Sequence, residues 1–393
     1  MSAETRDDGV PGSPPYNRVL RTDDWVITAT EDWRSQATEW CALERRALPS
    51  PFHSYTWAAS WYEIADASKA ASPLVVTGRY KDDRSLTVLL ALCRSRRYGL
   101  TMVSPADKGA SDYFKPLMDE RSAKTLPPMA LAGFFKALPD VLPRHDLVML
   151  NRLDSEDLPI LPSDWPHNTI RLAPVGTWSM DLDQVTRESL KSRLSSRLRK
   201  TLGSKIRAME KNLPRRVEHH WPLKDTDVLQ SVLDMQAERF ETTGHRNRVA
   251  EGPWRDLYAS IVKSNSAETH LAASLLFSGT TLTAGMIGFV TGSNYIGLVQ
   301  TFKHGPAERY SPGTQIVFET LGKALDEGIA SFELSIGDQP YKRSFGCQRR
   351  PLHTVVLPKT LLGKAAWCGW LARHAVRGLT GRLKRSGTHR VSA

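Results

Sequence analysis

The pattern of apolar and polar positions divides the first half of the chain into alternating helices and strands. Apolar residues three or four positions apart predict three helices, at 33–46, 57–67 and 123–138. Short apolar runs predict three strands, at 73–80, 85–94 and 146–153, and the polar residues between the first two indicate a hairpin. This succession of elements is typical of an α/β fold.

The second half repeats this order of elements. Its helices are predicted at 187–211, 226–242, 254–264 and 313–327, and its strands at 269–277, 280–291, 293–302 and 331–334. Ser278-Gly279 predicts a tight hairpin between the first two of these strands. Because both halves contain helices, a hairpin, a further helix and a strand in succession, the pattern indicates a duplicated α/β unit.

The segment between the two halves is rich in proline. Four prolines lie in a stretch with few periodic residues, which favours a domain boundary: Pro159, Pro162, Pro166 and Pro174. A chain of 393 residues is also longer than one hydrophobic core usually supports. We therefore expect a disordered leader over 1–24, one domain over 25–175, a second domain over 176–358 and a basic amphipathic tail over 359–393.

Charge and cysteine usage narrow the class of protein. The formal net charge of +11 favours encounters with the phosphates of a cofactor, with anionic lipid or with nucleic acid. The 4 cysteines form no CxxC pair and the histidines have no partners at metal-ligand spacing, so no metal site is predicted. Residues 1–16 lack the apolar stretch of a signal peptide, and no run reaches the ~18 apolar residues of a membrane span. We expect a cytoplasmic protein, peripheral at the inner face of the membrane if it contacts one.

Two basic segments are candidate binding surfaces. The helix predicted at 187–211 has a leucine-rich stripe, and cations cover the rest of its surface. The tail segment 359–385 places Trp367, Trp370 and several leucines beside lysines and arginines, which is typical of a helix in an anionic membrane interface. The same pattern fits a helix whose apolar side packs on the second domain, and the sequence leaves both interpretations open.

Four motifs in the second half carry a resemblance to known enzymes. They are, in order, the basic stretch 193–202, Glu238-Arg239-Phe240 with Gly244, Tyr310-Ser311-Pro312-Gly313 before a helix, and Phe332-Glu333-Leu334 followed by the turn 337–342. Over roughly 177–357 the chain resembles the GNAT-related acyltransferases of the CelD-type polysaccharide-biosynthesis group. More distantly, it resembles the Fem-type peptidoglycan aminoacyltransferases.

The resemblance implies two tandem GNAT-like units, each a mixed central sheet flanked by helices. It also implies a donor site at Ser311, Gly313 and Thr314, because the start of a helix offers backbone N–H groups to an anion. Ordinary GNAT enzymes use a glycine-rich loop for this purpose, whereas this chain offers Gly313, and a plain helix N-terminus is the alternative interpretation. The implied donor is acyl-CoA or an acyl carrier protein.

Candidate catalytic residues come from the fourth motif. Acyl transfer to an amine needs a base for the amine proton and a donor for the departing sulfur or the oxyanion. Glu333 and Asp338 are the candidate bases, and Tyr341 is the candidate donor. The alternative is structural, with Tyr341 filling the sheet edge and Asp338 paired with Lys342 in a surface turn.

Candidate substrate-binding residues are Glu238, Arg239 and Lys342. Glu238 and Arg239 can equally form an ion pair on the surface of their helix, which contributes little stability in water. The serines of the chain stand in no GxSxG motif, so the sequence does not favour a serine hydrolase.

The sequence predicts an acyltransferase that acts on an amine or hydroxyl, such as an amino sugar or a lipid-linked saccharide in polysaccharide biosynthesis. The alternative is a noncatalytic member of the fold that serves a polysaccharide-synthesis machine as a membrane-surface scaffold. Anionic-membrane contact through 359–385 suits both. Nucleic acid is not favoured because no reader motif accompanies the charge, although aminoacyl-tRNA stays open as a donor.

Overall fold

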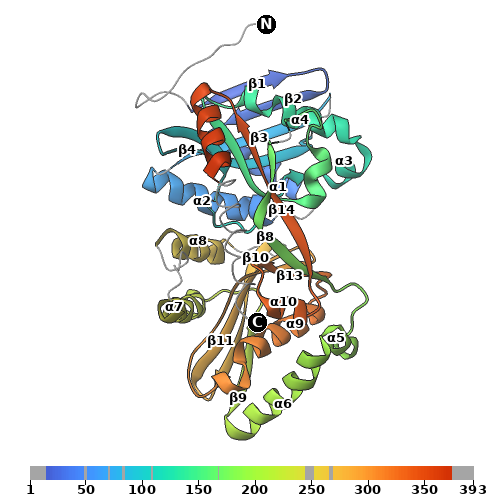
Figure 1. Ribbon diagram of the computed structural model, residues 1–393, viewed down its shortest axis with the longest axis vertical. Helices are drawn as coiled ribbons and strands as arrows, with labels where there is room; N and C mark the ends of the chain where they lie inside the picture. Colours follow the sequence, from blue (N-terminus) through green and yellow to red (C-terminus); the bar gives the residue numbers. More distant parts are fainter. Residues whose placement is uncertain are drawn as a thin grey trace, which may run out of the picture.

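The computed structural model describes residues 15–47, 51–69, 71–81, 85–107, 109–166, 168–243, 252–264 and 269–373. Within these residues, one mixed sheet of fourteen strands runs through the molecule, in the order β1-β2-β3-β4-β5-β7-β14-β8-β13-β12-β11-β10-β9, with β6 paired to β4 (Figure 1). The predicted α/β fold with helices flanking a mixed sheet is therefore confirmed. The sheets of the two units are continuous rather than separate.

The N-terminal half supplies one end of this sheet and the helices beside it. Its elements are β1 Asn17–Arg21, β2 Trp25–Thr30, α1 Ala37–Glu44, α2 Tyr55–Ser68, β3 Ser72–Tyr80, β4 Val88–Arg97, β5 Leu100–Pro105, β6 Leu117–Met118, α3 Glu120–Thr125, α4 Pro128–Val141 and β7 Leu147–Asp154.

The C-terminal half supplies the other end of the sheet. Its elements are β8 Ile170–Asp181, α5 Arg187–Arg193, α6 Ser196–Asn212, β9 Arg215–His220, α7 Thr226–Thr243, α8 Gly252–Lys263, β10 Thr269–Ser278, β11 Thr281–Thr291, β12 Asn294–Phe302, α9 Pro312–Asp326, β13 Ser331–Ile336, α10 Pro340–Ser344 and β14 Gln348–Pro358. A further helix covers 361–373.

Two strands connect the halves. β14 pairs with β8 along most of its length and with β7 from Leu352 to Pro358, while β8 pairs with β13 on its other side. In Figure 1, β8 and β14 run side by side from one half into the other. The domain boundary expected at residue 175 lies inside β8, so the division into 25–175 and 176–358 stays a prediction.

Several local expectations need correction. Residues 17–21, placed in the disordered leader, form β1 against β2. The helix predicted at 123–138 is two helices, because the prolines at 127 and 128 end α3 and begin α4. The helix predicted at 187–211 is also broken, since Ser195 caps a new helix with its side-chain oxygen. Residues 1–14, Gly244 and the tail from 374 onward lie outside the described residues.

Helices pack on both faces of the C-terminal sheet, because successive side chains along each strand point to opposite faces. In β10, Leu271, Ala273 and Leu275 belong to the apolar cluster that contains α7 and α8, while Ala272 and Leu276 belong to the cluster that contains α9. The first of these clusters continues into α1 and α2 of the N-terminal half, where Trp61 stacks on Trp254 of α8 with ring centroids 5.8 Å apart. The halves therefore share a core as well as a sheet.

In each half, two parallel strands diverge after a short paired stretch. β5 and β7 pair at Met102 and Val103, and β12 and β13 pair at Asn294, Tyr295 and Ile296. In the N-terminal half the opening is filled, because Phe114 forms a bridge to Leu153 of β7 and is fully buried. In the C-terminal half a cavity lies at the corresponding place.

No helix among the described residues is long and apolar enough to span a bilayer.

Candidate active site

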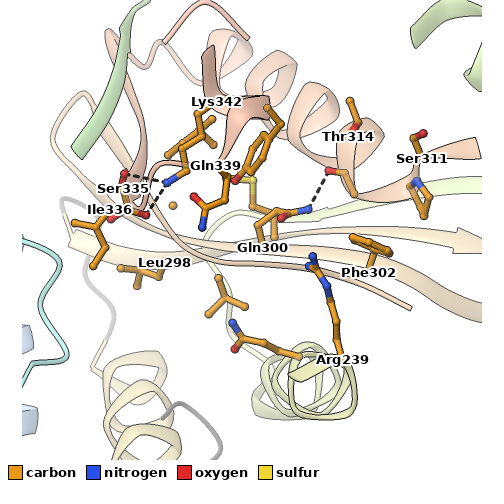
Figure 2. A pocket seen from close by; sticks show the side chains of 18 of the residues that line it. Arg239, Leu298, Gln300, Phe302, Ser311, Thr314, Ser335, Ile336, Gln339 and Lys342 are labelled. Atoms are coloured by element: carbon orange, nitrogen blue, oxygen red, sulfur yellow. Dashed lines mark hydrogen bonds between the residues drawn. The ribbon is translucent and has the colours of Figure 1, made fainter. Parts of the chain in front are cut away.

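A cavity of about 550 Å³ opens where β12 and β13 diverge. Its walls come from β12, the end of β13, α7, the start of α9 and α10, and Asp112 enters from the N-terminal half. Figure 2 labels lining side chains from β12, β13, α7, α9 and α10, among them Arg239, Thr314 and Lys342. Six residues predicted from the sequence line it: Arg239, Ser311, Gly313, Thr314, Tyr341 and Lys342.

The edge of β12 forms one wall. Beyond Ile296 this strand has no partner on its β13 side, although β11 pairs with its other side up to Phe302. A bulge at Leu298, which the register of β11 skips between Gly297 and Val299, bends the strand at the cavity. A free strand edge offers backbone N–H and C=O groups to an extended ligand, as an additional strand would use them.

The start of α9, where the sequence predicts a donor site, forms another wall. Ser311 adopts the left-handed conformation, with φ 58°, and the N–H groups of Thr314 and Gln315 donate to its carbonyl. Since Pro312 has no N–H, Gly313 supplies the backbone donor that remains in the first turn. The turn therefore offers an anion fewer N–H groups than a glycine-rich loop would.

Charged groups of both signs border this turn. The Arg239 guanidinium lies over the ring of Phe302, 4.1 Å from its centroid, and burial lowers the pKa of this arginine. The carboxylate of Glu308 also lines the cavity and contacts Nδ1 of His304 at 3.1 Å. A cation and an anion thus line the cavity near the start of α9.

Lys342 holds a buried amine at the base of the cavity. Its Nζ donates to the carbonyl oxygens of Ser335 and Ile336, at 3.1 and 2.6 Å (Figure 2). An ammonium carries three N–H groups, so one remains beyond these two carbonyls. Burial lowers the pKa of Lys342 to about 8, and the charge of Asp112 opposes that shift.

Tyr341 precedes Lys342 on α10 and faces the same cavity. Burial raises the pKa of its phenol to about 12, so the hydroxyl keeps its proton at neutral pH. A protonated phenol can donate a hydrogen bond or a proton to a developing anion.

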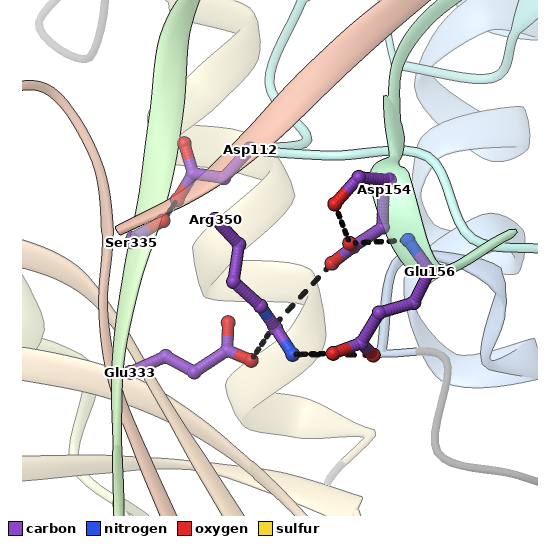
Figure 3. A network of polar contacts seen from close by, with 7 residues as sticks. Asp112, Asp154, Glu156, Glu333, Ser335 and Arg350 are labelled. Carbon is purple, nitrogen blue, oxygen red and sulfur yellow. Dashed lines mark hydrogen bonds and ion pairs between the residues drawn. The ribbon is translucent and has the colours of Figure 1, made fainter. Parts of the chain in front are cut away.

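Asp112 is the residue that sequence reasoning missed. It lines the cavity from the loop beside Phe114, it is partly buried, and Ser335 donates a hydrogen bond to its Oδ2 (Figure 3). Burial raises the pKa of its carboxyl, while the Ser335 hydrogen bond and nearby Arg152 and Lys342 lower it. Its sequence neighbours form no motif. Asp112 reaches this site because the N-terminal half, which contains it, shares a sheet with the C-terminal half.

Glu333 lies outside the cavity, in a polar network beneath it. Arg350 of β14 contacts Glu333 of β13 at 2.9 Å, Asp154 at the end of β7 at 3.4 Å and Glu156 at 3.4 Å (Figure 3). Burial raises the pKa of the Glu333 carboxyl. These contacts join three strands of the sheet, and the catalytic role of Glu333 stays a prediction.

Asp338 and Glu238 also lie outside the cavity lining. Asp338 is exposed, and its Oδ1 accepts from Nε of Arg349 at 2.8 Å and from Nε1 of Trp178 at 3.1 Å. The Arg349 contact lowers the pKa of that carboxyl. Glu238 is an exposed residue of α7 that lies 3.8 Å from Lys303. As structural alternatives, the sequence predicted ion pairs of Asp338 with Lys342 and of Glu238 with Arg239. In the structure Asp338 contacts Arg349 instead, and Glu238 contacts Lys303.

Within the described residues, no three His, Cys, Asp or Glu side chains come together as a metal site.

Comparison with known proteins defines the class of this domain. Residues 196–343 match the model of the acetyltransferase (GNAT) domain family. This segment contains α6, β12, α9 and β13, together with Tyr341 and Lys342 of α10. The chain therefore carries an acyltransferase domain of the GNAT type. A search of curated proteins finds no match to the chain.

Solved structures with a similar fold span most of the chain. FemX shares 9% sequence identity with a TM-score of 0.54, and the match covers 78% of this chain and 96% of FemX. The C-terminal domain of a putative lysylphosphatidylglycerol synthetase from Agrobacterium fabrum gives 12% identity, a TM-score of 0.49, and coverage of 85% and 95%. The FemX similarity shows a shared fold across both halves.

Proposed function

We propose that this protein transfers an acyl group from a thioester on a pantetheine arm to an amine or hydroxyl in the cavity between β12 and β13. One observation carries the proposal. The open edge of β12 leads directly to a site where Asp112, Tyr341 and Lys342 face the same space. A strand edge for an extended arm and proton-transfer groups at its end are what acyl transfer requires.

Asp112 is the proposed base. The acceptor nitrogen attacks the thioester carbonyl, an N–C bond forms, and the amine proton passes to the Asp112 carboxylate. The C–S bond then breaks, and the departing sulfur takes a proton from the Tyr341 hydroxyl. The proton on Asp112 returns to Tyr341 through solvent, which restores both groups.

Lys342 is the proposed stabiliser of developing negative charge. Its ammonium is fixed by two backbone carbonyls, so its remaining N–H needs little reorganisation to reach an oxyanion. Arg239, at the mouth, is the proposed contact for an anionic part of the donor.

For the donor we propose acyl-CoA or an acyl carrier protein, which share the pantetheine arm. The single N–H that Gly313 adds at the start of α9 suits one phosphate group better than a tightly cradled pyrophosphate. Aminoacyl-tRNA, the donor of Fem-type enzymes, is a third donor class for the test below.

For the acceptor we propose an amino sugar or lipid-linked saccharide in polysaccharide biosynthesis. The support is the resemblance of the sequence motifs to the CelD-type group. We place the reaction in the cytoplasm, where thioester donors are made.

The test is a donor screen on the full chain. Thiol release and product masses are measured with short- and long-chain acyl-CoA, acyl carrier protein and aminoacyl-tRNA, each mixed with amino sugars. We expect one thioester to release thiol and to raise the melting temperature, since a ligand of the folded state stabilises it. If none of these donors raises the melting temperature and no acylated product forms, the proposal is contradicted and the scaffold alternative is favoured.

A further inference from the structure

Exposed apolar side chains lie on two neighbouring segments, the β4–β5 hairpin and the helix at 361–373. Tyr98, at the tip of the β4–β5 hairpin, is 87% exposed, and Leu361 and Leu362, at the start of the 361–373 helix, are 84% and 56% exposed. Trp370, nine residues after Leu361 on that helix and 39% exposed, stacks on Trp367. Large apolar side chains grouped on a surface mark an interaction site.

Asp146 holds the hairpin and the helix together. Its carboxylate accepts from the Thr101 backbone N–H at 2.8 Å and from the Thr360 hydroxyl at 2.6 Å, one oxygen for each. Gly363 packs so closely on the Asp146 backbone that an added Cβ would lie 2.1 Å from the carbonyl oxygen. At Thr360 and Gly363 the start of this helix therefore packs on the N-terminal half, while the rest of the predicted tail, 374–385, lies outside the described residues.

Cations border the apolar side chains. Arg144, Lys364 and Arg373 are exposed, and none of them has an ion-pair partner within the described part of the chain. The nearby carboxylates are engaged, since Asp140 pairs with Lys359 and Asp146 bonds the two threonines. The local field is therefore positive.

We propose that this amphipathic surface, formed by Tyr98, Leu361, Leu362, Trp370, Arg144, Lys364 and Arg373, binds an anionic lipid bilayer peripherally. Aromatic and leucine side chains enter the boundary between headgroups and acyl chains, and the flanking cations meet anionic headgroups. Because the surface combines two segments far apart in the sequence, it fixes an orientation of the N-terminal half on the membrane. The proposal does not depend on the acyl-transfer activity.

The test measures binding of the full chain to vesicles by co-sedimentation. Vesicles contain phosphatidylcholine alone or with about one third phosphatidylglycerol. We expect binding to the anionic vesicles only, and loss of that binding near 1 M salt, where the screening length is about 3 Å.

Three variants and one matched control locate the contact. Tyr98→Ser, and Leu361→Gln with Leu362→Gln, are each expected to weaken vesicle binding about tenfold. Lys364→Gln with Arg373→Gln is expected to weaken binding to anionic vesicles by about 25-fold, from about fivefold for each cation. Met129→Gln is the control, because Met129 is 86% exposed at the far end of α4.

Unchanged melting temperatures show that each variant folds. Binding of the surface variants equal to that of Met129→Gln would overturn the proposal. Failure of the wild-type protein to bind anionic vesicles would do the same. A concentration-dependent dimer that the leucine variant abolishes, without vesicle binding, would instead assign the surface to a second copy of the chain.

Discussion

At the scale of single residues, the cavity holds opposite charges whose burial moves both pKa values toward neutrality. Burial raises the pKa of the Asp112 carboxyl and lowers that of Lys342 to about 8, and each charge opposes the shift of the other. Acid–base catalysis is most effective when catalytic groups titrate near the working pH. This arrangement suits Asp112 to accept a proton and Lys342 to stabilise negative charge.

The pair predicts a bell-shaped pH dependence of kcat/KM. The lower limb reports deprotonation of Asp112, above the ordinary range of an aspartate. The upper limb is expected near pH 8, because rising pH removes the Lys342 proton and with it the charge that stabilises the oxyanion. Initial rates of thiol release across the pH range provide the measurement.

Lys342→Arg identifies the group responsible for the upper limb. An arginine stays charged at all accessible pH values, so the variant should lose the fall near pH 8 even if its maximal rate is lower. An upper limb that stays in place would assign it to another group that must keep its proton, and would contradict the role of Lys342.

Tyr341→Phe and Asp338→Asn distinguish the cavity from the neighbouring turn. Tyr341 lines the cavity, so removing its hydroxyl is expected to lower kcat by about 10²-fold if it donates the proton. Asp338 contacts Arg349 and Trp178 outside the lining, so its variant is expected to keep the wild-type rate. A large loss in Asp338→Asn, with Tyr341→Phe unaffected, would reverse these assignments.

At the scale of elements, Arg350 connects β14 with β13 and β7. It lies between Glu333 and Asp154, whose side chains are 8% and 3% exposed. Removing the cation leaves buried carboxylates without a counter-charge, so Arg350→Met is expected to lower the free energy of unfolding by about 3 kcal/mol or more. Urea denaturation provides this measurement.

The neighbouring arginine is the control for that variant. Arg349 pairs with exposed Asp338, so Arg349→Met is expected to change the free energy of unfolding by less than about 1 kcal/mol. Equal effects of the two substitutions would show that the network under the cavity has no special structural weight.

Helices and strands whose apolar residues recur at a regular period could be predicted from the sequence. Strands whose conformation depends on pairing with neighbouring strands could not. α2, β10, β11, β12 and α9 lie within a few residues of their predicted ranges because their apolar faces meet a core. β14 was not predicted, since its exposed and arginine-rich first part, Gln348 to Arg350, has no strand-like alternation of apolar residues. Its conformation comes from β7 and β8 on either side.

The site was predictable only in part, for a related reason. Residues that follow a strand or begin a helix in the C-terminal half, such as Gly313, Tyr341 and Lys342, could be placed from local motifs. Asp112 could not, because more than a hundred residues separate it from every other lining residue and the shared sheet brings it there. Glu333 follows the motif but its side chain turns to the opposite side of β13 from Leu334.

At the scale of the whole molecule, the shared sheet and core predict one unfolding transition. The largest apolar cluster contains Trp57 and Trp61 of one half with Leu257 and Phe289 of the other. Unfolding of either half would therefore expose apolar residues of the other half to water. We expect near-ultraviolet circular dichroism and ligand binding to be lost together on heating. Two separate transitions would show that the halves are independent domains.

The central claim is that Asp112, from the N-terminal half, accepts the acceptor's proton in the cavity of the C-terminal GNAT domain. The most direct measurement is kcat/KM for thiol release by wild type and Asp112→Asn with the donor found in the screen. We predict a loss of about 10²-fold or more for the variant, with donor binding retained. An Asp112→Asn rate equal to that of the wild type would contradict the account.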